Sequence, residues 1–577
     1  MSVRRHAIKV MFLSVGLTLS NVSLSAQPSL EVASEIYSGG NIITMDSSKP
    51  TAEAVAVNGS QILAVGSLSE MEKHRGLDTR SVDLDGNTLL PGFIDAHGHF
   101  GMVGLLEMSA NLAAPPEGVC ADIATIVRQM KAHIDSPQTK ESGVVFGMNY
   151  DDSQLAELRH PTAAELDRVS TSLPVVILHQ SGHVGAVNSK ALALFGYDET
   201  TADPAGGVLQ RLPGSRKPSG VLEEMALFTP MLPLLTPASE ESGAAMLHAA
   251  QRAYFAAGFT TAQEGRADRA SLDSLRKFAS AGQLLIDVNV YPDPGFYGSD
   301  EALKQLLKGR TPGYQNHFRV GGIKLSLDGS PQAKTAWLSQ PYHVVPEGLD
   351  KDYAGYPAMR PERVAKYVDM AFASGWQILV HSNGDAAIDQ FVSAVGTARA
   401  AHGDKDIRPV VIHAQTARED QLDAMKALGV IPSFMTVHTF YWGDWHRDSV
   451  LGPARAARIS PTRSALDRNM LYTAHNDAPV TLPNALMILS SQVNRTTRSG
   501  QVLGAAQRVP VQEALKSITS NAAYQNFEEQ SKGSITPGKV ADFVILNGNP
   551  LTVAPASLTG IDVTATIKGG KTVYSAP

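Results

Sequence analysis

The sequence predicts an α/β protein built around parallel strands. Short apolar runs alternate with stretches of helical periodicity through most of the chain, which is the pattern of parallel βα units. Histidine, lysine and aspartate residues stand at the ends of several of these runs. The expected strands number eight and span residues 90–96, 259–263, 285–291, 320–327, 377–380, 410–412, 430–434 and 470–473. Eight such units predict a (β/α)8 TIM barrel, whose catalytic residues lie at the C-terminal ends of the strands.

Helices are expected between these strands, at residues 241–256, 361–374, 386–402 and 419–428. A long excursion, residues 101–240, separates the first strand from the second and contains its own strand-like runs at 144–148 and 175–178. Loops of that length are usually functional or form an inserted subdomain. We therefore expect residues 101–240 to form a cap over the mouth of the barrel.

The two ends of the chain carry short β-prone runs separated by Gly, Asn and Ser turns. Chain termini often lie together, and isolated hairpins are only marginally stable. We expect residues 27–88 and 530–577 to combine into one small β-sandwich domain. The barrel domain is then residues 89–529, with the insertion inside it.

The first 26 residues resemble a cleaved signal peptide. Arg4, Arg5 and Lys9 precede an apolar run, residues 10–24, that ends in small residues. Such a run is short for a membrane span, so we expect no stable membrane insertion after cleavage, with a signal anchor as the alternative. The paired arginines resemble a twin-arginine signal, although Ala7 weakens the match. The expected location is periplasmic or secreted.

Composition narrows the classes of function. The 577-residue chain is 43% hydrophobic and 18% charged, with a formal net charge of −7. This balance gives no basic field, so neither nucleic acid nor an anionic membrane surface is expected as a partner. Cys120 is the single cysteine, which excludes an internal disulfide and a cysteine-rich metal site. A bound metal must therefore use His, Asp, Glu or Lys.

The first barrel strand leads into His97-Gly98-His99. Alternate residues of a strand share a face, so both imidazoles project the same way and suit one metal ion. Asp95 lies one strand repeat earlier and is placed to support an imidazole. A bare His-x-His is more often an ordinary pair of half-buried histidines, so the case depends on residues further along the chain.

Four further polar residues stand at the ends of expected strands. Lys324 ends or nearly ends the fourth strand, His381 the fifth, His413 the sixth and Asp477 the eighth. A barrel places its active site at these positions. A lysine among apolar neighbours is costly unless it is paired or modified.

These motifs together resemble the amidohydrolase superfamily of metal-dependent hydrolases, and more narrowly its branch of N-substituted formamide deformylases. The resemblance runs from about residue 37 to the end and is carried by residues 91–99, Lys324, 328–330, 335–336, 341–342, His381, 384–385, His413 and 477–479, with 183, 188–192, 220–222 and 224 in the insertion.

The resemblance implies two divalent metal ions, with zinc expected. It places His97, His99 and Asp477 on the first ion and His381 and His413 on the second. Lys324 would bridge the two as a carbamate formed with CO2. A metal-bound water would be the nucleophile, and Asp477 would take its proton and pass it to the leaving nitrogen. Family habit also implies a homodimer.

Several other residues have roles that the sequence leaves open. His183 either polarises the scissile carbonyl from the cap or is an ordinary buried histidine. His438 and Trp442 follow the seventh strand and either line the substrate pocket or serve as packing. Glu264 and Asp328 are candidates for hydrogen bonds to substrate or to loops.

The sequence thus favours an exported hydrolase acting on carbon–nitrogen bonds other than peptide bonds, with a small-molecule amide, N-acyl or N-formyl substrate. Two enzymatic alternatives remain, a mononuclear deaminase and an ester, lactone or carbamate hydrolase of the same superfamily. A non-enzymatic binding or regulatory protein is disfavoured, because a buried His, Lys and Asp cluster is expensive to retain without metal.

Overall fold

A computed structural model describes residues 31–204, 206–235, 237, 239–309, 313–346 and 348–577. The predicted signal peptide, residues 1–26, lies outside the described residues. Within the described ranges, every helix is too short or too polar to cross a lipid bilayer.

Strands from the two chain ends share one sheet. Its order is β25-β24-β23-β7-β2-β3, and β23 pairs antiparallel with β7. The bounds of these strands are β2 Asn41–Ile43, β3 Thr51–Ala52, β7 Thr88–Pro91, β23 Phe543–Leu546, β24 Val563–Lys568 and β25 Lys571–Ser575. A second, four-stranded sheet of order β5-β4-β1-β6 uses β1 Ala33–Ser38, β4 Ala54–Asn58, β5 Gln61–Gly66 and β6 Arg75–Asp83, with the short helix α1 Leu68–Met71 beside it.

Parallel strands build the central part of the molecule. One sheet has the order β17-β16-β15-β8 and another the order β18-β19-β20-β21-β22. Their bounds are β8 Phe93–Ile94, β15 Phe259–Ala267, β16 Asp287–Pro292, β17 Phe318–Val320, β18 Gly322–Ser326, β19 Gln377–Ser382, β20 Val410–His413, β21 Ile431–Phe434 and β22 Thr473–Ala474. All their pairings are parallel, as consecutive βα units require.

The first expected strand, residues 90–96, is divided between two sheets. Residues up to Pro91 pair with β23, and the chain then joins the parallel sheet beside β15 as β8. Gly92 stands at the crossing, where a Cβ would lie 2.4 Å from the side chain of Thr260. The close approach of β15 therefore requires glycine there. The fourth expected strand is likewise divided at Gly321 into β17 and β18.

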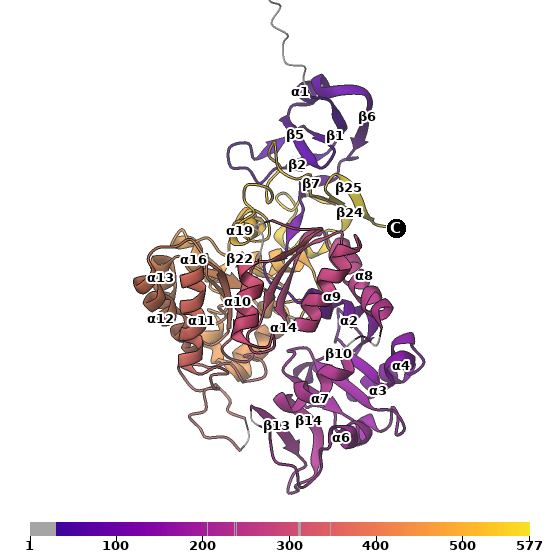
Figure 1. The fold of residues 1–577 in the computed structure, drawn as a ribbon, viewed down its shortest axis with the longest axis vertical. Helices are drawn as coiled ribbons and strands as arrows, with labels where there is room; N and C mark the ends of the chain where they lie inside the picture. The colour runs from indigo at the N-terminus through magenta and orange to yellow at the C-terminus, as the bar shows by residue number, and fades with distance from the viewer. Residues whose placement is uncertain (1–30, 205, 236, 238, 310–312, 347) are drawn as a thin grey trace, which may run out of the picture.

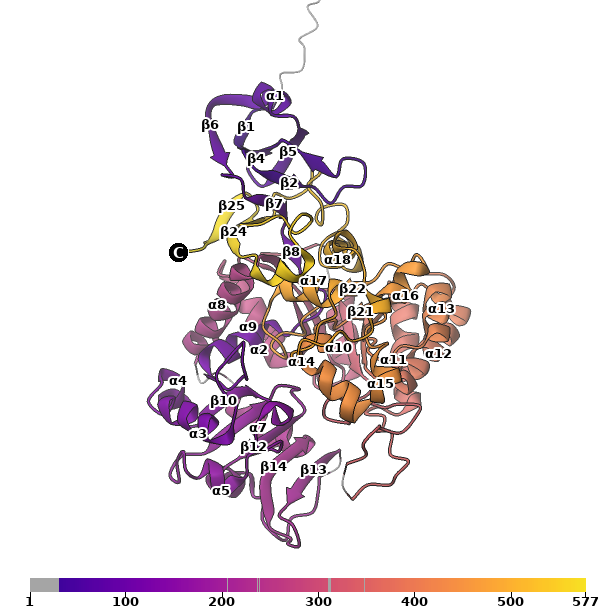
Figure 2. The same cartoon turned by 180° about the vertical axis from the view of Figure 1, so that it is seen from behind.

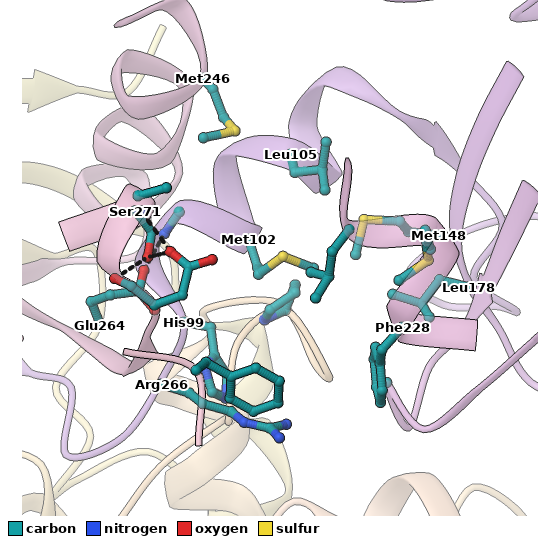
Figure 3. A pocket seen from close by; sticks show the side chains of 18 of the residues that line it. His99, Met102, Leu105, Met148, Leu178, Phe228, Met246, Glu264, Arg266 and Ser271 are labelled. Atoms are coloured by element: carbon teal, nitrogen blue, oxygen red, sulfur yellow. Dashed lines mark hydrogen bonds between the residues drawn. The ribbon is translucent and has the colours of Figure 1, made fainter. Parts of the chain in front are cut away.

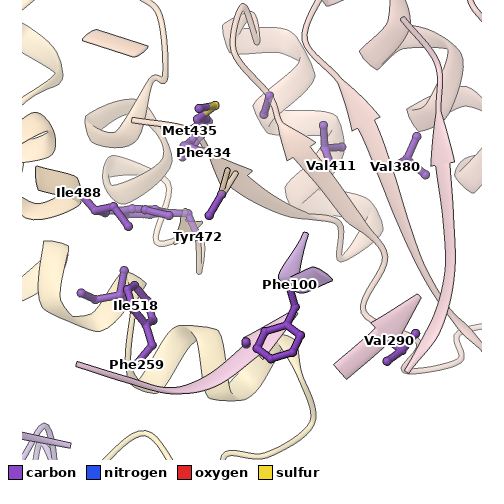
Figure 4. Packing of buried hydrophobic residues seen from close by; sticks show 14 of the residues in the cluster. Phe100, Phe259, Val290, Val380, Val411, Phe434, Met435, Tyr472, Ile488 and Ile518 are labelled. Carbon is purple, nitrogen blue, oxygen red and sulfur yellow. The ribbon is translucent and has the colours of Figure 1, made fainter. Parts of the chain in front are cut away.

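Helices cover the parallel strands. Four of them, α8 Glu240–Ala256, α11 Pro361–Ser374, α12 Asp385–His402 and α13 Glu419–Leu428, match the expected helices within a residue. The others are α9 Arg269–Ser280, α10 Asp300–Lys308, α14 His438–Trp445, α15 Gly452–Ala456, α16 Thr462–Asp467, α17 Ala485–Val493, α18 Val511–Ser517 and α19 Ser520–Gln525. Figure 4 shows strand residues such as Val380, Val411 and Phe434 in one buried cluster with Ile488 and Ile518.

The insertion has a sheet of its own, with the order β13-β14-β12-β11-β10-β9. The strands are β9 Ala110–Asn111, β10 Val145–Tyr150, β11 Val175–His179, β12 Val184–Val187, β13 Gly207–Arg211 and β14 Pro218–Glu224, and the helices are α2 Phe100–Met108, α3 Ile123–Ala132, α4 Pro137–Ser142, α5 Ala163–Leu166, α6 Ser189–Phe195 and α7 Met225–Leu235. Figures 1 and 2 show it on the side of the parallel strands away from the terminal sheets. Two buried hydrogen bonds dock it: Asn149 donates to the Pro479 carbonyl at 3.0 Å, and the Trp442 indole donates to Asp151.

Candidate metal centre

His97 is held in one orientation by Gln263 on β15. His97 Nδ1 lies 2.6 Å from Gln263 Oε1, while Gln263 Nε2 donates to the Ala96 carbonyl at 3.0 Å. Because the Gln263 amide NH2 is committed to a carbonyl, its oxygen must accept the His97 Nδ1 proton. His97 Nε2 therefore carries the lone pair that can bind a metal ion. The sequence predicted that Asp95 supports an imidazole. Its carboxylate instead accepts hydrogen bonds from the Tyr254 hydroxyl at 2.8 Å and from the His97 backbone N–H.

His381 and His413 face each other at the ends of β19 and β20. His381 Nε2 lies 3.1 Å from the Gly329 carbonyl, which can only accept, so Nδ1 is the free nitrogen. His413 Nε2 lies 3.0 Å from that His381 Nδ1. On its other side, His413 Nδ1 lies 3.2 Å from His475 Nε2, and His475 Nδ1 lies 2.9 Å from Ser433 Oγ. A proton on His413 Nδ1 leaves His413 Nε2 free to bind a metal.

Asp477 and Lys324 complete the cluster. Asp477 Oδ1 lies 3.3 Å from His99 Nε2 and 3.4 Å from His97 Nε2, and the Lys324 Nζ lies 3.2 Å from His97 Nε2. The six predicted metal ligands thus meet at one place. Asp477 Oδ1 is buried without a hydrogen-bond partner among the described residues, which suits an oxygen that binds a cation. Donor atoms of His97, His413 and Asp477 all lie within 4.8 Å of one another.

Electrostatics favour the neutral histidines that a metal requires. Burial lowers the pKa of His97, His381 and His413 well below the ordinary value, and the Lys324 ammonium adds to the effect on His97 and His381. Burial also lowers the pKa of Lys324 to about 8. Buried neutral imidazoles beside a carboxylate are a donor set that zinc prefers.

The backbone at two of these ligands is in the left-handed region. His413 has φ +73° and Asp477 has φ +55°. A non-glycine residue in this region costs about 1–3 kcal/mol and persists where the surrounding structure imposes it, which is most often at functional sites. The strain therefore falls on two of the residues that define the cluster.

His183 reaches the cluster from the insertion. Its Nδ1 donates to Glu224 Oε1 at 2.8 Å, and its ring centroid lies 6.0 Å from that of His381. Burial lowers the pKa of His183, but the Glu224 carboxylate outweighs this effect and raises it. The Glu224 carboxylate therefore favours the protonated form of His183, whose ring lies beside that of the candidate metal ligand His381. Sequence reasoning left its role open and did not single out its partner as an orienting group.

The other predicted substrate-binding residues divide into two groups. Glu264 lines the cavity beside the cluster and accepts from the Gly101 backbone N–H at 2.8 Å. The Asp328 carboxylate is used locally, since it accepts three backbone N–H groups at 2.7 to 3.0 Å. His438 and Trp442 are buried, and neither is among the described residues that line this cavity.

Gln263, His475, Ser433 and Glu224 are site residues whose roles the sequence did not reveal. Gln263 and His475 stood at or beside expected strand ends, which was the one available signal. Their partners lie far away in the chain, so only the folded structure shows what they contact.

A second cluster, Asp151, Asp152 and His179, lies in the insertion with donor atoms equally close together. The Asp151 carboxylate already accepts from Ser153 and from the Trp442 indole. His179 Nδ1 accepts a backbone N–H at 3.0 Å, so its proton lies on Nε2, 3.0 Å from Asp152 Oδ1. Asp151 thus already has donors within the fold, while His179 Nε2 is in ion-pair contact with Asp152 and has no hydrogen-bond partner among the described residues.

A cavity of about 1250 Å³ opens from the metal ligands toward the insertion. His99, Lys324, His381 and Asp477 form its inner end. Figure 3 shows His99, Glu264 and Arg266 on one side of the cavity and methionine, leucine and phenylalanine side chains on the other. A substrate in this cavity would contact the barrel and the insertion together.

Comparison with known proteins identifies the family of the chain. "Protein LONG AFTER FAR-RED 3" of Arabidopsis thaliana is 29% identical over 565 residues, covering 94% of this chain and 92% of that protein. "N-substituted formamide deformylase" of Arthrobacter pascens is 26% identical over 544 residues, covering 92% and 97%. An uncharacterized metal-dependent hydrolase from Pyrococcus horikoshii has the same fold, with a TM-score of 0.70 at 23% identity over 90% of this chain and 99% of that one. The model of the Amidohydrolase family matches residues 80–574, and the chain therefore belongs to that family.

Proposed function

We propose that this protein is a metal-dependent hydrolase that cleaves a non-peptide carbon–nitrogen bond, in an amide, N-acyl or N-formyl group of a small molecule. The observation that carries the proposal is the convergence of six side chains that are suited to bind metal, with Asp477 Oδ1 buried without a hydrogen-bond partner among the described residues. The name of the Arthrobacter relative supports the choice of a carbon–nitrogen bond.

The donor set fits two divalent ions, with zinc the expected metal. His97, His99 and Asp477 would hold one ion, and His381 and His413 the other. Lys324, between the two groups, would bridge them as a carbamate. When bound, such ions polarise a carbonyl and make a water molecule nucleophilic near neutral pH. The position of Lys324 supports this binuclear arrangement over a mononuclear deaminase.

The residues of the chain would then move the protons. Asp477 is placed to accept a proton from the attacking water and deliver it to the leaving nitrogen. His183, whose pKa is raised by Glu224, would donate a hydrogen bond to the carbonyl oxygen as negative charge develops on it. The same residues would serve an ester, lactone or carbamate, so the bond cleaved must be settled by assay.

We also infer that the eight strands close into a barrel and that the terminal segments, residues 27–88 and 530–577, form the small β-sandwich beside it. Support for closure comes from a parallel bridge between Gly98 and Ala478 and from the His99 N–H, which donates to the Ala478 carbonyl at 2.7 Å. These contacts join the first strand to the last. Closure would bring the eight strand ends around one centre.

Asp477→Asn tests the proposed chemistry. On a panel of N-formyl and N-acyl compounds with matched esters, kcat should fall by at least about 100-fold, because an amide cannot take up the proton. Asp467→Asn, at an exposed position on α16, is the control and should keep full activity. Full activity in the Asp477 variant, or turnover of the esters alone, would overturn the assignment.

A further inference from the structure

The cavity is larger than an amide group needs. Binding pockets for small molecules usually have volumes of about 300–1000 Å³, whereas this one measures about 1250 Å³. A formyl group and its nitrogen would occupy only the inner end, between His99 and Asp477. The remaining space must be accounted for by another part of the substrate.

Apolar side chains line the insertion side of that space. Met102 and Leu105 lie one helical turn apart on α2, Met246 projects from α8, and Phe228 comes from α7. The apolar wall, as we call it, consists of Met102, Leu105, Met148, Leu178, Phe228 and Met246, and Figure 3 shows these six around one open volume. A continuous apolar surface of this kind marks a binding groove.

The apolar wall begins directly at the metal ligands. His99 is the residue immediately before α2, and Met102 and Leu105 follow it at intervals of three residues. Residues three apart in a helix lie on the same face. A chain attached to a carbonyl or nitrogen at the metal centre would therefore run along α2 without crossing a polar strip.

The charges around the cavity are already engaged with one another. Lys277 pairs with Glu240, and Arg266 donates to Asp293 at 3.2 Å while lying over the Phe296 ring. Asp268 accepts from the backbone N–H and the hydroxyl of Ser271. These partners reduce the gain from pairing with an ionised substrate group, so the cavity favours an uncharged substituent.

Three of the six wall residues are methionines. The thioether side chain is flexible and polarisable, so it fits apolar groups of varied shape. The wall therefore suits a range of hydrocarbon groups and does not define a single rigid one.

We propose that the substrate carries a long or bulky uncharged hydrocarbon substituent, which lies against the apolar wall while the carbonyl group faces His183 and the metal ligands. This inference rests on the proposed function. It assigns the class of compound, an amide with a hydrocarbon arm, that the site selects over short-chain amides.

Two homologous series test the inference with purified, metal-loaded protein. One is a set of straight-chain N-acylanilides from acetyl to dodecanoyl, and the other a set of N-alkylformamides from methyl to dodecyl. Each buried methylene contributes about 0.8 kcal/mol, which is about a fourfold gain when burial is complete. We expect kcat/KM to rise about two- to fourfold per methylene over the first several carbons, in at least one series.

Substitutions in the apolar wall test whether these residues cause the dependence of kcat/KM on chain length. Phe228→Ala and Met102→Ala should reduce kcat/KM more for the dodecanoyl compound than for the acetyl one, which lowers the dependence on chain length. Phe440→Ala, on α14, and Met359→Ala, near α11, are matched controls, because these side chains are also half-buried and neither is among the residues that line the cavity. Both controls should keep the dependence of the wild type.

The outcomes distinguish a failure of the proposed function from a failure of the inference about the apolar substituent. If no amide of either series is hydrolysed, the proposed function fails. If amides are hydrolysed with kcat/KM independent of chain length in both series, the proposed function stands and the apolar substituent is wrong. The wild-type series decides the matter even if a variant does not fold, and wall variants that behave as the controls do would also overturn the inference.

Discussion

His475 is the residue that links the histidine cluster to the barrel. It is fully buried, it lies 3.2 Å from His413 Nδ1, and its ring meets that of His97 edge-on at 5.4 Å. Burial lowers the pKa of His475 to about 3, so it is neutral. A neutral imidazole with Ser433 on its far side can accept the His413 proton, and in this way it would orient His413 Nε2 toward the metal.

Replacing His475 should therefore weaken metal binding. Loss of a group that orients a metal ligand typically costs about 10–100-fold in affinity. We expect this loss for zinc in His475→Ala, measured by chelator competition, with partial recovery in His475→Gln, which keeps an acceptor. His402→Ala, which removes an exposed histidine paired with Asp369, should bind zinc as the wild type does. Equal affinities in all three variants would show that His475 only packs.

Residues at strand ends could be predicted because a short apolar run in the sequence indicates the strand that precedes each of them. His381 and His413 follow short apolar runs, and the structure brings both together with Asp477. Gln263 could not be identified as the partner of His97, because the two are 166 residues apart and the contact depends on the alignment of β8 with β15. The local sequence pattern predicts an element and the residue at which it ends. The residue that a side chain contacts depends on tertiary structure.

At the scale of elements, the pairing of β12 with β14 determines the state of His183. Val184 stands opposite Glu223 in the ladder, so the next residues outward, His183 and Glu224, meet at the cavity. The Glu224 carboxylate raises the pKa of His183 against the effect of burial. Catalysis that needs cationic His183 is present below this raised pKa and is lost as the pH rises through it.

Glu224→Gln removes the charge and should move the alkaline limb of the kcat/KM profile to lower pH, since His183 then loses its proton earlier. Glu223→Gln is the matched control, because Glu223 contacts Gln210 on the neighbouring strand. Its profile should follow that of the wild type. Coincident profiles for all three proteins would show that His183 does not act as a cation in the reaction.

Elements with uninterrupted periodicity were predictable within a residue, as α11 and α13 show. The first barrel strand was not, because apolar residues alone do not reveal that the chain changes sheets at Gly92. The role of Trp442, on α14, was left open, and the structure shows that its indole donates to Asp151 of the insertion. Contacts between the insertion and the barrel carry no signal in local sequence.

On the scale of the whole molecule, a buried ion cluster joins the barrel to the C-terminal segment. Asp287 on β16 pairs with Lys532 at 2.6 Å and with Lys568 on β24, which also pairs with Asp542 at 2.7 Å. Burial opposes ionisation of Asp287, but the two ammonium groups outweigh it and hold its pKa well below the usual range. These contacts connect segments that are up to 281 residues apart.

Asp287→Asn should lower the free energy of unfolding by about 3 kcal/mol, because the buried Lys532 and Lys568 would lose the carboxylate that they share and keep only Glu528 and Asp542. The depressed pKa adds a pH effect: the stabilisation is present above about pH 4, the value for an unfolded aspartate, and is lost as the pH falls toward the folded pKa. Urea denaturation at neutral and acidic pH measures both. Asp273→Asn, at an exposed pair, should cost less than about 1 kcal/mol. A similarly small loss for Asp287→Asn would contradict the account.

The central claim is a bridged metal centre, and metal content per chain tests it most directly. Protein purified without chelators, and its Lys324→Ala variant, would be analysed by elemental mass spectrometry. We expect about two zinc-like ions per chain in the wild type and fewer in the variant, because Lys324, whose Nζ lies 3.2 Å from His97 Nε2, would bridge the two ions. One ion that is unaffected by the substitution, or none in either protein, would contradict it.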